Sequence, residues 1–143
     1  MKLRPIILQE DKSIEEYTSP DCQQLLSMYD DFYPKIGFKL PWVGYFVFNN
    51  NQVVGTGGFI GQPKYGKVEI AYWTFKEFEG QGVATFACKE LIAISKNADP
   101  TIIITAKTAP EYNVSTKILQ NNGFTFSEIV QDDEIGDAWL WIL

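Results

Sequence analysis

Between Val68 and Ile94 the pattern of an apolar strand runs through a Gly-x-Gly-x-Ala turn directly into the pattern of an amphipathic helix. Gly80 and Gly82 allow the backbone to turn tightly without a Cβ clash. The unpaired N–H groups of the first helical turn can then converge on one anion, which the helix dipole also attracts. This stretch therefore predicts a phosphate-binding helix start made by Gly82, Val83, Ala84 and Thr85.

Other interpretations of the glycines are a purely structural turn or a nucleotide-binding loop of another class. A Rossmann dinucleotide site needs glycine at the third position, which is Ala84 here, and an acid at the end of the following strand, which the IIITAK segment lacks. A Walker loop is excluded because no Gly-Lys-(Ser/Thr) sequence follows. A structural glycine turn stays open at this point.

Composition excludes several function classes. The net charge is −6, with no basic stripe, so we expect no nucleic-acid partner. Histidine is absent, which removes Ser-His-Asp, Cys-His and His-based zinc sites. We therefore expect no metal, and any acid or base must be a carboxylate, a tyrosine, a serine or water.

The chain length of 143 residues predicts a single domain, 1–143. No apolar run approaches the roughly 18 residues that a membrane helix needs, and the charged start MKLRPIILQED is unlike a signal peptide. We expect a cytoplasmic protein with no membrane partner. Cys22 and Cys88 fall in helical patterns and are expected to be buried free thiols.

Hydrophobic periodicity predicts mostly β-hairpins with one βαβ crossover. This order implies an α+β fold: a mixed, mostly antiparallel sheet with helices on both faces and one parallel strand pair. The Gly-rich turn then lies at the carboxyl ends of that parallel pair, where ligands collect. The expected strands are 3–8, 42–48, 53–60, 67–74, 101–106, 124–130 and 137–143, and the expected helices begin near Pro20, Gly82 and Asn113.

Three polar residues outside the Gly-rich turn are candidates for chemistry. Glu69 is a carboxylate inside an apolar strand, and it is either a solvent-facing residue or a base whose pKa half-burial would raise. Asn113 and Ser115 open the last predicted helix in the sequence NVSTKILQNNGF. Asn and Ser commonly cap helix N-termini, so a structural role is open for both.

Together these motifs resemble the GNAT superfamily of acyl-CoA-dependent N-acyltransferases, in particular the branch of ribosomal-protein N-terminal alanine acetyltransferases. The family's pyrophosphate loop matches Glu79-Gly80-Gln81-Gly82-Val83-Ala84, with Glu79 in place of the usual Gln or Arg. The second motif matches Asn113, Ser115 and Gly123-Phe124, and Leu119 stands where many relatives have a tyrosine general acid. The resemblance covers most of the chain.

The resemblance implies direct transfer of an acetyl group from acetyl-CoA to a primary amine. Glu69 would deprotonate the amine, backbone N–H groups of Ile70, Ala71 and Tyr72 would bind the thioester oxygen, and Ser115 would protonate the leaving thiolate. Asn113 would bind the pantetheine arm, which lies between two splayed strands. Tyr112 and water are alternative proton donors, and acyl-CoA binding without turnover or a purely structural role are alternative functions.

The acceptor would be a small molecule or a peptide amine, in a monomer or a homodimer. In relatives, the acceptor pocket is shaped by the segments that correspond to 32–42 and 61–66. These segments have no diagnostic charge pattern here. The acidity of the whole chain mildly favours a cationic amine.

Overall fold

The computed structural model describes residues 1–143 and contains one seven-stranded sheet, in the order β1-β2-β3-β4-β5-β7-β6. Only β4 and β5 pair in parallel, and every other neighbouring pair is antiparallel. The strands are β1 (Lys2–Pro5), β2 (Gly44–Asn49), β3 (Gln52–Phe59), β4 (Lys67–Thr74), β5 (Ile103–Thr108), β6 (Thr125–Asp132) and β7 (Gly136–Ile142). The predicted mixed, mostly antiparallel sheet is confirmed.

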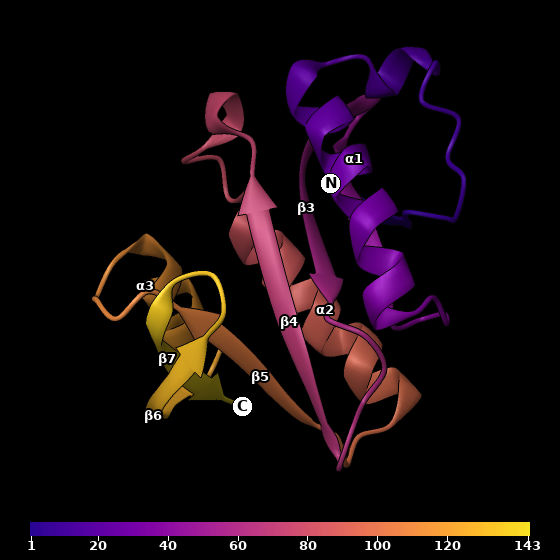
Figure 1. Cartoon of the computed structure of the whole chain (residues 1–143). Coiled ribbons are helices and arrows are strands. Elements are labelled where there is room, and N and C mark those ends of the chain that lie inside the picture. The colour runs from indigo at the N-terminus through magenta and orange to yellow at the C-terminus, as the bar shows by residue number, and fades with distance from the viewer.

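Helices cover both faces of this sheet (Figure 1). The helix α1 (Pro20–Ile36) lies on one face, and α2 (Val83–Ala98) lies on the other; α3 (Val114–Asn121) follows β5. Two short 3-10 turns, η1 (Glu15–Tyr17) and η2 (Lys76–Phe78), complete the secondary structure. None of the helices has both the length and the apolar character that crossing a bilayer requires.

All of the strand bounds except the end of β1 agree with the sequence predictions within two residues, and the shifts at β1 and β5 have local causes. The first strand ends at Pro5 and not at Leu8, because the Ile7 N–H donates to the Glu10 carboxylate and not to a strand (2.9 Å). The strand β5 starts two residues later than predicted. There the Asp99 carboxylate accepts bonds from the N–H and the hydroxyl of Thr101, which hold that residue in a turn.

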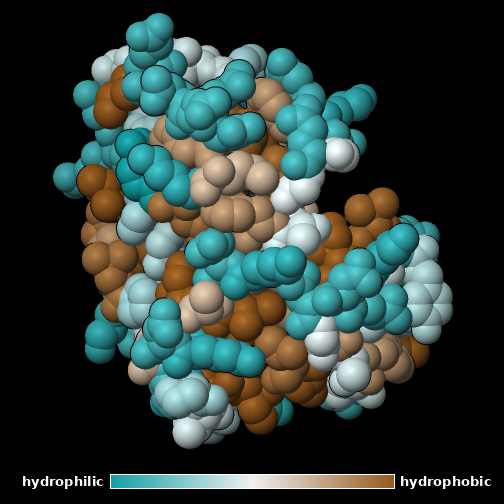
Figure 2. Space-filling model, turned by 180° about the vertical axis from the view of Figure 1, so that it is seen from behind, coloured by the Kyte–Doolittle hydropathy of each residue, from teal (hydrophilic) through white to brown (hydrophobic).

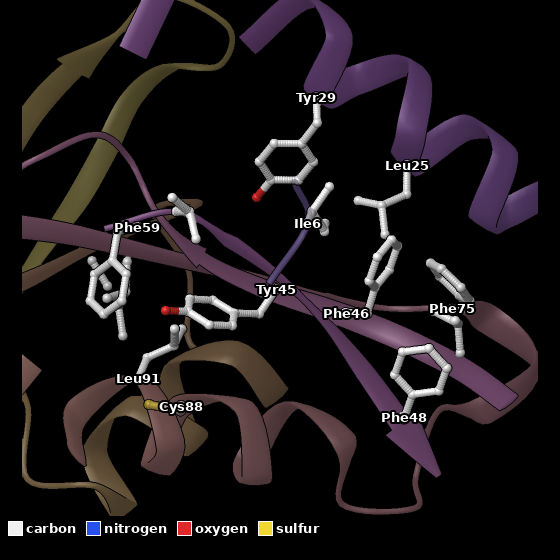
Figure 3. Close-up of a cluster of buried hydrophobic side chains, with 14 of the residues drawn as sticks. Ile6, Leu25, Tyr29, Tyr45, Phe46, Phe48, Phe59, Phe75, Cys88 and Leu91 are labelled. Atoms are coloured by element: carbon white, nitrogen blue, oxygen red, sulfur yellow. The ribbon is translucent and has the colours of Figure 1, made fainter. Parts of the chain in front are cut away.

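Two apolar layers hold the helices to the sheet (Figure 3). Tyr29 and Leu25 of α1 point toward the sheet from one side, and Leu91 and Cys88 of α2 point toward it from the other. The α1 layer is packed so closely that a Cβ on Gly44 would lie 2.2 Å from the Tyr29 ring. Cys22 and Cys88 are free and buried, as predicted.

The parallel strands β4 and β5 pair only over their first four residues. Their register runs from Lys67 opposite Ile103 to Ile70 opposite Ala106, and then the strands diverge (Figure 1). Beyond Ile70, β4 still pairs with β3 as far as Thr74, on its other edge. The edge of residues 71–74 that faces β5 therefore has no strand partner. This is the splayed pair that the family resemblance implied.

Candidate active site

A groove of about 690 Å³ opens where β4 and β5 diverge. Seen from behind, the surface is indented between the upper part of the molecule and the lobe at the right (Figure 2). The groove brings together the end of β4, the Gly-rich turn and the starts of two helices. Its lining residues are Tyr72, Trp73, Thr74, Glu79, Gly80, Gly82, Val83, Ala84, Thr85, Val114, Ser115 and Ile118.

The α2 helix starts in this groove without a side-chain cap. Gly80 and Gly82 have φ angles of 79° and 81°, in the left-handed region that favours glycine. Gly82 is the N-cap residue and has no side chain that could accept from the first turn. The first helical bond runs from Phe86 N–H to the Gly82 carbonyl (3.0 Å), so the N–H groups of residues 83–85 have no intrahelical acceptor. This geometry suits an anion.

Eight of the twelve residues predicted to bind the cofactor line this one groove: Tyr72, Glu79, Gly80, Gly82, Val83, Ala84, Thr85 and Ser115. The other four do not line it. Ile70 is buried in the core, and Ala71 faces the α1 side of the sheet. Gln81 is exposed, and Asn113 lies at the helix end beside the groove.

Glu69 is half-buried on the α1 side of β4, where its carboxylate lies 3.5 Å from the Lys107 ammonium. That ammonium also lies 3.7 Å from the Asp132 carboxylate. Burial raises the pKa of Glu69 above the ordinary value of 4.5; Lys107 opposes this shift, and Asp132 adds to it. The predicted direction of the pKa shift is thus present. The sequence interpretation missed Lys107, because nothing in the IIITAK pattern shows that it faces Glu69.

A pair of hydroxyl groups lies inside the groove. The Tyr72 hydroxyl donates to the Ser115 carbonyl (3.2 Å) and lies 3.4 Å from the Ser115 hydroxyl. Burial raises the pKa of Tyr72 to about 12, so it keeps its proton across the neutral range. Sequence reasoning placed Tyr72 near the cofactor only through its backbone. Residues 72 and 115 are too far apart in the chain for any motif spacing to link them.

Two other positions were considered for the proton donor: position 119, where many relatives have a tyrosine, and Tyr112. Neither lines the groove. Leu119 is fully buried in the core. Tyr112 is 74% exposed, and its ring packs edge-on against Trp139, with centroids 4.8 Å apart. The groove receives the Ser115 hydroxyl from α3 and the hydroxyls of Tyr72 and Thr74 from β4.

Asn113 forms a complete capping box at the start of α3. Its side chain accepts from Thr116 N–H (3.1 Å), and its own N–H donates to the Thr116 hydroxyl (2.8 Å). Asn113 therefore caps the start of α3, which is the structural role that the sequence left open for it.

A second cavity of about 230 Å³ lies on the opposite face, between α1 and strands β3 and β4. Eight of its eleven lining residues are hydrophobic. Tyr72 and Trp73 line both this cavity and the groove, so the two spaces meet at the end of β4.

The chain is similar to known proteins in sequence and in fold. A family model described as an acetyltransferase (GNAT) domain matches residues 3–125. No curated protein sequence is significantly similar to the chain.

Solved structures with the same fold include several acetyltransferases. One is RimL, a ribosomal L7/L12 α-N-protein acetyltransferase in complex with coenzyme A (17% identity, 86% of this chain and 71% of that chain, TM-score 0.64). Another is the microcin C7 self-immunity acetyltransferase MccE, in complex with acetyl-CoA and AMP (18%, 85% and 71%, TM-score 0.67). A third, from Salmonella typhimurium, modifies the N-terminal serine of L7/L12 (18%, 89% and 76%, TM-score 0.63).

Proposed function

The chain belongs to the acetyltransferase (GNAT) family, and we propose that it transfers an acetyl group from acetyl-CoA directly to a primary amine, with residues 1–143 acting as one domain. The observation that carries this proposal is the groove in which an uncapped helix start and an unpaired strand edge lie together. The uncapped helix start suits a pyrophosphate. The unpaired strand edge suits the amide groups of a pantetheine arm.

We propose that the phosphates bind at the first turn of α2. Backbone N–H groups of residues 82–85 would donate to them, helped by the positive end of the helix dipole. Glu79 also lines this part of the groove, in the position where relatives have Gln or Arg. Its carboxylate would therefore point toward solvent when an anion is bound, because two negative charges in contact repel each other.

Glu69 would take a proton from the attacking amine, directly or through one water. Its half-buried position and raised pKa support this role, because a stronger base at neutral pH transfers the proton more readily. Lys107 favours the ionised form of this carboxylate, because its ammonium lowers the pKa of Glu69 against the effect of burial. The proton that Glu69 takes would leave the neutral amine nitrogen as that nitrogen forms its bond to the thioester carbonyl carbon.

Backbone N–H groups of β4 around residues 70–72, where its pairing with β5 ends, would stabilise the negative charge that develops on the carbonyl oxygen. The carbon–sulfur bond then breaks, and the thiolate takes a proton from Ser115 or from solvent. Glu69 would release the amine proton to solvent, and Ser115 would regain its proton from solvent. The net reaction moves one acetyl group to nitrogen and one proton from nitrogen to sulfur. A thiol pKa of about 8.5 makes the thiolate a tolerable leaving group.

A second candidate function is acyl-CoA binding without turnover. The buried Leu119 favours it, because α3 brings no tyrosine hydroxyl to the groove. An assay that follows both free thiol release and amide formation with a panel of amines distinguishes the two functions. A sensor binds coenzyme A but releases thiol no faster than the uncatalysed reaction.

Glu69→Gln tests the proposed enzyme most directly. We expect kcat to fall by about 10² or more, the usual scale of general-base catalysis, with coenzyme A affinity unchanged because Glu69 lies on the other face of β4. In the parent enzyme activity should rise with pH through the raised pKa of Glu69, since only the ionised carboxylate accepts a proton. An unchanged pH–rate profile in the variant would remove Glu69 from the mechanism.

A further inference from the structure

The cavity between α1 and β4 indicates which amines the site accepts. We propose that the acceptor carries a bulky apolar or aromatic group next to its primary amine, and that this group occupies the cavity. This inference rests on the proposed acetyl transfer. It concerns a surface that the coenzyme groove does not use, apart from the two residues that both spaces share.

The cavity exists because small residues are paired across β3 and β4. Ala71 lies between Glu69 and Trp73 on the α1 face of β4, and its cross-strand neighbour is Gly58. Above Gly58, the Tyr29 hydroxyl fills the space, since a Cβ on that glycine would lie 2.8 Å from it. Nothing comparable covers Ala71, which stays exposed. The floor of the cavity is therefore Ala71.

The walls are apolar and partly open to solvent. Met28 and Phe32 of α1 form one side, Trp73 forms one end, and Ile60 forms the other. Ile60 is 41% exposed, and the other three side chains are only half-buried. A bound apolar group would remove this surface from water, which favours binding by about 25 cal/mol for each Å² of apolar surface buried.

The cavity lies within reach of the chemistry. Alternate residues of a strand point to the same face and lie roughly 6.6 Å apart, so the Ala71 floor lies one such step from Glu69. At its other end the cavity shares Tyr72 and Trp73 with the coenzyme groove. A group seated over Ala71 therefore holds a neighbouring amine between the Glu69 carboxylate and the strand edge proposed to bind the thioester.

The size of the cavity matches one aromatic side chain. An apolar protein cavity of about 150 Å³ accommodates benzene. The present cavity, at about 230 Å³, has room for a phenyl or a larger ring.

The lining argues against a polyamine. None of the lining residues is charged. The Thr56 hydroxyl already donates to the Tyr45 carbonyl (2.8 Å), and Gln24 is neutral. A second ammonium group in the cavity would have no carboxylate partner and would lose hydration. The net charge of −6 suggests a cationic acceptor, but the local apolar lining outweighs this effect because distant surface charges are screened.

The test compares acceptors at saturating acetyl-CoA. We expect kcat/KM for 2-phenylethylamine and tryptamine to exceed that for ethylamine and spermidine by about 10- to 100-fold, the factor that burial of one large apolar group supplies. Peptides with an N-terminal Phe and with an N-terminal Gly form a second set of acceptors. Comparing them with the free amines shows whether the apolar group belongs to a peptide N-terminus or to a small-molecule amine. Equal rates across the panel, or a preference for spermidine, would overturn the inference and leave the proposed transferase intact. Absence of any acetylated amine would instead contradict the proposed function.

A charge placed in the cavity sharpens this test. Met28→Glu should lower kcat/KM for 2-phenylethylamine by at least tenfold and reduce the preference over spermidine, while coenzyme A affinity stays at the parental value. Ser27→Glu adds the same charge to the adjacent, exposed position of α1, and it should change neither value. If Met28→Glu does not fold, Ile60→Glu places the charge at the exposed end of the cavity. An unchanged preference in the folded variant would exclude the cavity as the acceptor site.

Discussion

Two helices begin at the same groove, and they begin in opposite ways. The α2 helix starts at Gly82, which offers no side-chain cap, so the N–H groups of its first turn remain available. The α3 helix starts at Asn113, whose side chain and backbone exchange hydrogen bonds with Thr116 in a capping box. Both starts have the positive end of a helix dipole.

The difference shows that proximity to a groove does not make a helix start an anion site. The N–H groups of α3 that the cap satisfies cannot donate to a ligand without breaking bonds of the cap. At α2 no such bonds have to break. We therefore propose that the phosphates bind at α2 and that Asn113 serves stability, while Ser115, the second residue of α3, keeps a hydroxyl in the groove.

The largest expected difference between the two starts is in coenzyme binding. Gly82→Asp places a carboxylate against the phosphates and a Cβ at a φ of 81°, so we expect coenzyme A affinity to fall by about 10²-fold, measured by calorimetry. Asn113→Asp is the matched control, because it adds the same charge to α3 and keeps a capping oxygen. Parental affinity in Gly82→Asp, or an equal loss in both variants, would refute the comparison.

An effect of intermediate size is expected at the hydroxyl pair. Ser115→Ala should slow acetyl transfer in single turnover by about tenfold, less than the usual 10²–10⁴ of acid catalysis because water in an open groove can replace the hydroxyl. Tyr72→Phe removes the neighbouring hydroxyl and tests whether the two act together. If Ser115→Ala melts at a lower temperature but retains the parental transfer rate, Ser115 is structural and solvent is the acid.

The smallest effect is expected at the α3 cap, and in stability only. Asn113→Ala should lower the free energy of unfolding by about 1 kcal/mol, a shift of about 4 °C in Tm, because Thr116 N–H loses its acceptor. Coenzyme A affinity should stay unchanged. Weaker binding at parental stability would instead show that the Asn113 side chain contacts the ligand, as the family resemblance implies.

Local sequence patterns predicted much of the fold. The bounds of β4 were predicted to the residue, and α2 begins one residue after its predicted start. These elements depend on short-range periodicity and on glycine conformations. The start of β5 was two residues off, because Asp99 holds Thr101 in a turn that the apolar run TIIITA conceals.

For the site, the sequence by itself determined the uncapped start of α2 and the position of Glu69 on an apolar strand. Both follow from backbone rules over a few residues: positive φ favours glycine, and side chains alternate along a strand. Only the tertiary structure decided that Lys107 faces Glu69, that Tyr72 meets Ser115, and that Ala71 forms the floor of an open apolar cavity. Those contacts join residues from different elements, and their geometry depends on how strands pair and how far they diverge, which no local pattern encodes.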